Sequence, residues 1–282
     1  MGNYASDQAE GLRRMLAGPK PRIYTFLSAT SDEEKGAMLV NLGASLAQSG
    51  SDVLMVDACV SAQGIAERMG ATQGASLLQV ARQERALDEV VQRMPQGFGI
   101  AALAHGAQRS ATREPQEMQR LANAFGVLST QADIVVVDAE LGKDDAFPIP
   151  TLAGSEIVVQ VSTSPESITT AYSIIKRING EVGRRPFSIL ITGASEKEAK
   201  VVYQNMAQAA NRYLAVKLNS VGSVPADEHT TRAARLGRSV VDAFPLAGAS
   251  VAFRRLAERI SLPELPGGEL QGVAPAAARL GL

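Results

Sequence analysis

The sequence predicts a doubly wound α/β fold with a mostly parallel sheet and a short N-terminal helix. Short apolar segments alternate with longer segments in which apolar residues recur at helical spacing, an order typical of parallel βαβ units. Several apolar segments, such as residues 134–137 and 157–159, are uninterrupted, as expected of strands covered by helices on both faces. With 282 residues, of which 45% are hydrophobic, the chain is long enough for one large α/β domain.

The first element that we expect is the helix over residues 7–15. Asp7 and Glu10 have the spacing of a capping box, and Gly18 with Pro19 ends the helix. Its apolar residues share one face: Ala9, Leu12 and Leu16.

Strands and helices then alternate to the end of the domain. We expect strands over residues 22–28, 52–57, 97–103, 133–138, 156–161, 187–192 and 218–224. We expect helices near residues 35–49, 61–69, 74–82, 115–130, 165–180, 195–214, 226–236 and 248–260. The helix from residue 165 has the clearest start, since Ser164 suits an N-cap and Pro165 the first helical position.

These elements divide the chain into three parts. Residues 1–21 form the N-terminal helix and a linker, residues 22–262 form the α/β domain, and residues 263–282 form a tail. The tail is rich in proline and glycine, a composition typical of mobile segments.

The net charge, the cysteine count and the lengths of the apolar segments limit which partners and which cellular compartment we expect. The net charge of −1 predicts no direct binding to nucleic acid and at most peripheral contact with a membrane. The single cysteine, Cys59, excludes an intramolecular disulfide and a multi-cysteine metal site, so we expect no metal and a reducing compartment. No apolar segment reaches the roughly 20 residues of a membrane span. We therefore expect a cytoplasmic protein.

The connection after the first strand has the place of a phosphate-binding loop without its chemistry. Such a loop needs glycines, so that backbone amides can approach an anion. Here Asp32, Glu33 and Glu34 occupy the position, and one contact of such an acid with a phosphate near 4 Å costs on the order of 4 kcal/mol. Ser31 and Glu34 fit a capping box instead. We expect Lys35 to pair with a strand-end aspartate rather than with phosphate.

Four segments carry a resemblance to a known family. The first is the N-terminal Asp-Gln-Ala-Glu-Gly-Leu-Arg of residues 7–13. The others are the helix start at Lys35, the strands over 53–57 and 134–138 that each end in aspartate, and the late strand and loop over 221–228. On these residues the chain resembles the MinD/ParA superfamily of deviant Walker P-loop ATPases, in the flagellar branch called FlhG, FleN or YlxH.

The departures from the family pattern concern nucleotide chemistry. The family loop KGGVGKT aligns on residues 30–36, where only its second lysine, Lys35, is retained. Thr30 replaces the signature lysine, Gly36 replaces the magnesium-binding hydroxyl residue, and Cys59 replaces the aspartate that positions the attacking water. The resemblance leaves a vestigial nucleotide-binding set of Lys35, Gly36, Asp57, Asp138 and Gly142. We expect ATP binding to be lost or weak, with no catalytic residue and no cofactor; ATP with Mg²⁺ is the alternative.

The resemblance implies a regulator of flagellar number or placement. In that branch the N-terminal element contacts an FlhF-like signal-recognition-type GTPase, which assigns partner contacts to Asp7, Gln8, Leu12 and Arg13. Flagellar switch (C-ring) proteins are a further partner class, and recruitment to the cell pole or inner membrane would follow. Two alternatives stay open: a functional MinD/ParA-type ATPase switch, or a MinD-like scaffold of another system such as cellulose synthesis or cell-pole organisation.

Overall fold

A computed structural model describes residues 20–262 of the chain, except residues 62, 112 and 143. The predicted N-terminal helix over residues 7–15, with Asp7, Gln8, Leu12 and Arg13, lies outside the described residues, and so does the tail over residues 263–282.

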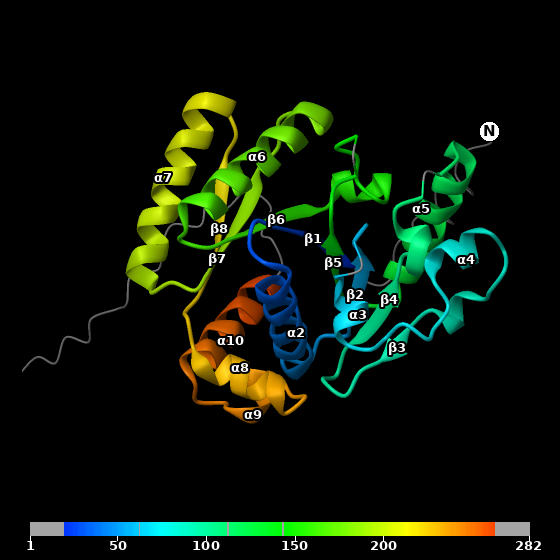
Figure 1. Ribbon diagram of the computed structural model, residues 1–282, viewed down its shortest axis with the longest axis horizontal. Coiled ribbons are helices and arrows are strands. Elements are labelled where there is room, and N and C mark those ends of the chain that lie inside the picture. Colours follow the sequence, from blue (N-terminus) through cyan, green and yellow to red (C-terminus); the bar gives the residue numbers. More distant parts are fainter. Residues whose placement is uncertain (1–19, 62, 112, 143, 263–282) are drawn as a thin grey trace, which may run out of the picture.

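The described residues form a doubly wound α/β domain around an eight-stranded sheet (Figure 1). The strand order is β3-β4-β2-β5-β1-β6-β7-β8, and every neighbouring pair is parallel except β3 with β4. The strands are β1 (Arg22–Ser28), β2 (Val53–Ala58), β3 (Gln92–Arg93), β4 (Gly99–Ala102), β5 (Ile134–Ala139), β6 (Glu156–Val161), β7 (Phe187–Thr192) and β8 (Leu218–Val224). The predicted fold class is thereby confirmed.

Helices cover both faces of the sheet. One face carries α2 (Asp32–Gln48), α3 (Ile65–Arg68), α8 (Glu228–Arg235), α9 (Val240–Ala243) and α10 (Gly248–Ser261). The other carries α4 (Leu77–Ala81), α5 (Pro115–Ser129), α6 (Pro165–Val182) and α7 (Glu196–Leu214). Short 3₁₀ turns lie at Leu87–Glu89, Gly106–Arg109 and Pro150–Gly154. None of the helices among residues 20–262 is long and apolar enough to cross a membrane.

Alternation within each strand supplies both hydrophobic layers. In β5, Val135 and Val137 pack under the α4–α7 layer, whereas Ile134 and Val136 pack under the α2 and α10 layer. All four side chains are fully buried. A strand that is covered on both faces has no polar side to display, which explains the uninterrupted apolar sequence.

The structure corrects several predicted elements. The helices predicted over residues 61–69 and 74–82 are shorter, at Ile65–Arg68 and Leu77–Ala81. In the first case the backbone amides of residues 59–61 donate to the carboxylates of Asp57 and Glu140 instead of continuing a helix, and the helix begins only after Gly64. The two-residue strand β3 and the one-turn helix α9 are too short to produce a recognisable sequence period.

Candidate functional site

The site lies where β1, β2 and β5 end on one edge of the sheet and α2 begins. Parallel strands in open α/β folds present their carboxyl ends to ligands at such an edge. The register places Asp57 of β2 directly beside Asp138 of β5, and Phe26 of β1 on the other side of Asp138. Two acids therefore stand next to each other at the predicted nucleotide position.

The connection between β1 and α2 is closed by groups of the protein itself. Ser31 is the N-cap of α2, and its hydroxyl accepts a hydrogen bond from the Glu34 amide at 3.3 Å. The Thr30 amide donates to the Ser28 hydroxyl at 3.0 Å, and the Ala29 amide donates to the Gln160 carbonyl at 2.9 Å. The predicted cap at Ser31 is correct. The second half of the predicted capping box is wrong, because the Glu34 side chain makes no return bond to the Ser31 amide.

Lys35 is buried, with 3% of its side chain exposed, and it points at acids rather than toward solvent. Its Nζ lies 3.1 Å from Asp138 Oδ1, 3.5 Å from Glu140 Oε1 and 3.8 Å from the exposed Asp32. Nζ also lies 3.4 Å from the Cys59 sulfur. Of the two partners that we expected for Lys35, Asp138 is therefore the one it contacts.

Asp57 pairs with a different cation, Arg109, which the sequence did not single out. Arg109 Nη1 lies 2.9 Å from Asp57 Oδ1, and Nη2 lies 3.0 Å from Oδ2, so the pair is bidentate. Asp57 is fully buried and Arg109 is 5% exposed. A planar guanidinium on a buried carboxylate is the strongest geometry available for such a pair. Each strand-end aspartate thus has its own buried cation.

The segment from Cys59 to Ala66 is held down by the same carboxylates. Asp57 accepts from the amides of Cys59 at 3.1 Å and Ala66 at 3.0 Å, and Asp138 accepts from the Ile65 amide at 2.9 Å. Glu140 accepts from the Ser61 amide and hydroxyl at 2.9 and 2.7 Å, and from the Val60 amide. The acids therefore serve as acceptors for backbone amides as well as partners for cations.

The pKa shifts follow from burial and from these partners. Burial lowers the pKa of Lys35, but the carboxylates of Asp138 and Glu140 raise it by more, so Lys35 stays charged. Burial raises the pKa of Glu140, but hydrogen bonds from Ser61 and the nearby ammonium bring it below its ordinary value. Burial also raises the pKa of the Cys59 thiol, which is therefore neutral. Burial raises the pKa of the Asp138 carboxyl above its ordinary value, although the Lys35 ammonium opposes that shift. The site is therefore a set of carboxyl–cation pairs around a neutral thiol.

Two carboxylates and a thiol at this site could together bind a metal ion, but two cationic side chains of the protein already lie against them. The oxygens of Asp57 and Asp138 and the sulfur of Cys59 lie within 4.8 Å of one another. The Lys35 ammonium stands against Asp138 and Cys59, and the Arg109 guanidinium covers both oxygens of Asp57. The residues present therefore fit Mg²⁺ poorly, because the two aspartates already have cationic partners.

The remaining predicted residues lie at the border of this cluster. Gly36 is buried on α2, and a Cβ atom built there would lie 2.4 Å from the Arg68 side chain of α3. Gly142 lies in the loop after β5, where its amide donates to the Ala146 carbonyl, away from the cluster contacts. Arg68 thus lies over the start of α2, where the resemblance places the nucleotide phosphates.

Two residues of the cluster were missed, Arg109 and Glu140. Arg109 lies 52 positions after its partner Asp57, in a segment without periodicity or motif. Glu140 follows Asp138 by two residues, and this second acid at the same strand end was the signal that could have found it.

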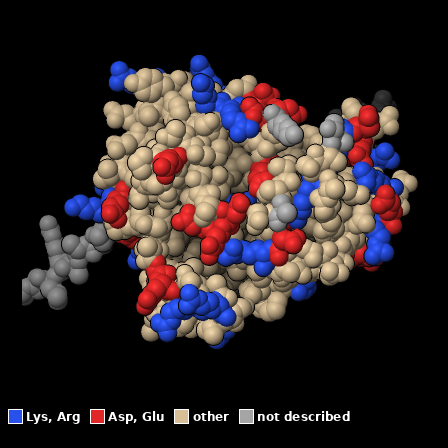
Figure 2. All heavy atoms as spheres, viewed as in Figure 1, with Lys and Arg blue, Asp and Glu red and all other residues tan. Residues whose placement is uncertain are grey.

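The charged side chains on the face seen in Figure 2 are of mixed sign. Figure 2 shows lysine and arginine side chains interspersed with acids over the face of the molecule that it presents. No broad basic area on this face offers itself to a polyanion.

Comparison with known proteins finds a relative by sequence and several neighbours by structure. The chain is 32% identical over 236 residues to antiactivator FleN of Pseudomonas aeruginosa, and this alignment covers 82% of this chain and 84% of that protein. The MinD cell division protein of Aquifex aeolicus superposes with a TM-score of 0.63 at 16% identity, covering 86% of this chain and 98% of MinD. A ParA family ATPase from Chlorobium tepidum gives 0.65 at 18% identity, with 85% and 99% coverage. No protein-family model matches the chain.

Proposed function

The chain belongs to the FlhG/FleN branch of the MinD/ParA superfamily, and from this membership we propose that it regulates flagellar assembly by contact with other proteins. It controls the number or placement of flagella from the cytoplasm, with recruitment to the cell pole or inner membrane. The Pseudomonas aeruginosa relative is an antiactivator, a protein that opposes an activator, which supports a mode of action by protein contact.

The second part of the proposal is that this contact needs no ATP cycle. The observation that carries it is the pairing of Lys35 with Asp138 and of Arg109 with Asp57 inside the protein. For Lys35 to serve a triphosphate it would have to leave Asp138, and breaking a buried ion pair costs roughly 3 to 5 kcal/mol. A ligand with a micromolar dissociation constant has only about 8 kcal/mol of binding free energy in total.

Thermal unfolding with and without Mg-ATP tests this part. A nucleotide present at 100 times its dissociation constant stabilises a protein by about 2.7 kcal/mol, a shift of roughly 5 °C or more for a domain of this size. We expect no shift for this chain, with the Chlorobium tepidum ParA family ATPase as the positive control. A shift comparable to that of the control would identify a functional ATPase switch and refute the ATP-independent mode.

The partner that we propose is an FlhF-like signal-recognition-type GTPase, contacted through Asp7, Gln8, Leu12 and Arg13. We expect GTP hydrolysis by that partner to rise with the full chain and with a peptide of residues 1–20. The Gln8→Ala variant should not stimulate, whereas Gln116→Ala, an exposed glutamine on α5, should behave like the unchanged chain. Equal stimulation by both variants would exclude the contact through Gln8. No stimulation by the unchanged chain would exclude the partner and leave a MinD-like scaffold of another system. Switch-complex proteins are a second partner class for the same assay format.

A further inference from the structure

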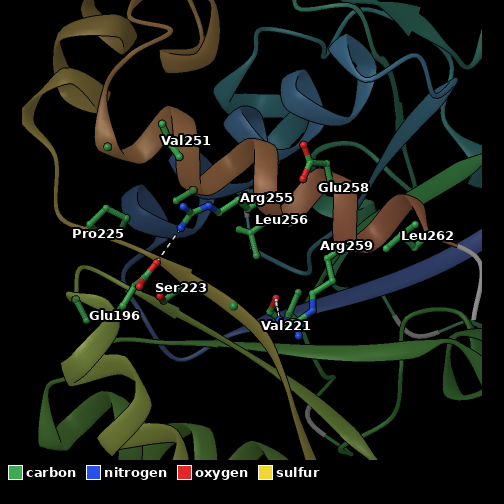
Figure 3. A pocket seen from close by; sticks show the side chains of 14 residues that line it. Glu196, Val221, Ser223, Pro225, Val251, Arg255, Leu256, Glu258, Arg259 and Leu262 are labelled. Atoms are coloured by element: carbon green, nitrogen blue, oxygen red, sulfur yellow. Dashed lines mark hydrogen bonds and ion pairs between the residues drawn. The ribbon is translucent and has the colours of Figure 1, made fainter. Parts of the chain in front are cut away.

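A groove runs along α10 between that helix, the edge strand β8 and the start of α7 (Figure 3). Its volume is about 520 Å³. The lining that matters here is apolar: Val221, Pro225, Val251, Ala252 and Leu256. A narrow apolar groove beside a helix is the usual receptor for the apolar face of an amphipathic helix.

Four charged side chains border the groove, and three of them already have partners within the domain. Arg255 of α10 reaches Glu196 of α7 at 2.9 Å, and Arg259 donates to the Val221 carbonyl of β8 at 2.9 Å (Figure 3). Glu258 also borders the groove and is exposed. The border is charge-balanced, with Glu196 and Glu258 against Arg255 and Arg259. Because Arg255 and Arg259 already have partners within the domain, Glu258 is the exposed acid that can meet an arginine of a docked segment.

The described chain begins at the end of this groove. Arg22, at the start of β1, donates a hydrogen bond to the carbonyl of Leu262, which lines the groove just after α10. Figure 3 shows Leu262 next to the β1 ribbon. Residues 1–19 therefore join the domain at the mouth of the groove.

We propose that the N-terminal segment of this chain, residues 1–17, docks in the groove between α10 and β8. Its sequence has the required features, since Ala9, Leu12 and Leu16 share a helical face and Arg13 and Arg14 suit Glu258. The tail after Leu262 is the rival occupant, but its prolines and glycines disfavour a regular helix.

The reach of the chain permits this docking. Five residues lie between Leu16 and Arg22, and the six residue-to-residue steps span up to about 20 Å when extended. The 14-residue helix α10 is about 21 Å long, so the segment can return along most of the groove. A short tether gives an effective concentration of about millimolar, so even weak intrinsic affinity populates the docked state.

The consequence rests on the proposed function. If residues 7–13 contact the GTPase partner, then docking hides Leu12 in the groove and holds the contact segment back until the partner competes for it. The groove thus regulates access to the segment, and the domain itself acts as the intramolecular competitor.

Trypsin cleavage of the full chain tests the docking directly. Cleavage after Arg13 or Arg14 reports release of the N-terminal segment, and cleavage after Arg279 reports the tail, both followed by mass spectrometry. Val251→Glu places a charge in the groove and should speed cleavage after Arg13 or Arg14 by about tenfold, the population change expected for losing one buried apolar contact. Val127→Glu, at a 57% exposed position of α5, should leave the rate unchanged.

A second variant distinguishes loss of docking from misfolding of the groove, because it changes the N-terminal segment and leaves the groove intact. Leu12→Asp lies in the segment itself and should produce the same acceleration as Val251→Glu. Equal cleavage rates in all variants would overturn the docking, and acceleration after Arg279 alone would assign the groove to the tail instead. The outcome of the GTPase stimulation assay does not depend on either result. The docking proposal and the proposed function can therefore be refuted independently. If both hold, Val251→Glu in the full chain should stimulate the partner more strongly than Val127→Glu.

Discussion

The substitution Lys35→Met probes whether the buried lysine is a structural partner of Asp138. Methionine keeps the volume and the apolar stem of lysine but removes the charge, so Asp138 keeps its amide bond and loses its cation. Breaking one partner of a buried ion pair costs about 3 to 5 kcal/mol, because the remaining charge is left uncompensated. We expect that loss in the free energy of unfolding, measured by urea denaturation at pH 7.

A double-mutant cycle separates the pair from general packing effects. Asp138→Asn keeps an oxygen for the Ile65 amide, so the double variant Lys35→Met/Asp138→Asn should recover about 2 kcal/mol or more of the loss. The matched control is Lys200→Met, at an exposed lysine on α7, which should change stability by less than about 0.5 kcal/mol.

The pH dependence provides a second readout of the same pair. Because the pKa of Lys35 is raised in the folded state, its stabilisation is fully present below its unfolded pKa and is lost only as the pH rises through the folded value. The contribution of Lys35 to the difference between Lys35→Met and the unchanged chain should therefore stay constant up to about pH 9. A change in that difference at lower pH would report titration of Asp138, whose pKa burial raises and the Lys35 ammonium lowers. A cost similar to that of Lys200→Met, or no recovery in the double variant, would refute the structural role of the pair.

Three further substitutions test the surroundings. Ser31→Ala should lower the free energy of unfolding by about 1 kcal/mol, and Glu34→Ala should cost clearly less, because only the Ser31 hydroxyl caps α2; equal costs in urea denaturation would contradict this. Glu140→Gln should destabilise the chain above about pH 4.5 and progressively less as the pH falls through the depressed pKa of Glu140, so its unfolding curves should converge on those of the unchanged chain in acid. Gly64→Ala places a Cβ atom 2.2 Å from the buried carboxylate of Asp57 and should cost more than 2 kcal/mol by thermal or chemical unfolding, whereas a cost near zero would show that this carboxylate can move.

The fold could be predicted from the sequence because its strands are buried on both faces. Apolar segments such as β5 and β6 contain no polar interruption, and the predicted positions of β1, β6, β7 and β8 agree with the structure. The elements that the sequence did not predict are short: β3 has two residues and α9 has four. Elements of that length form because the surrounding chain places them, and they carry no periodic signal of their own.

The candidate site could be predicted only in part. Lys35 and the two strand-end aspartates were found because strand ends and helix starts leave a local pattern. Arg109 could not be found in this way, because its contact with Asp57 spans 52 positions and depends on how the loop after β4 folds back. Long-range ion pairs have no local signature, so the identity of a partner for a buried charge requires the tertiary structure.

The two neighbouring aspartates of the site are stabilised by cations and amides of the protein itself. Asp57 and Asp138 stand side by side, with one oxygen of each within 4.8 Å of the other, and two like charges within that distance repel by about 3.5 kcal/mol or more at an effective dielectric constant of about 20. Arg109 and Lys35 offset that repulsion, and the amides of Ala66 and Ile65 use the remaining acceptor capacity. The cluster therefore ties β2, β5, α2 and the start of α3 together. For the mode of action proposed above, in which one surface is presented to a partner, such a fixed arrangement is more useful than a site that rearranges with a ligand.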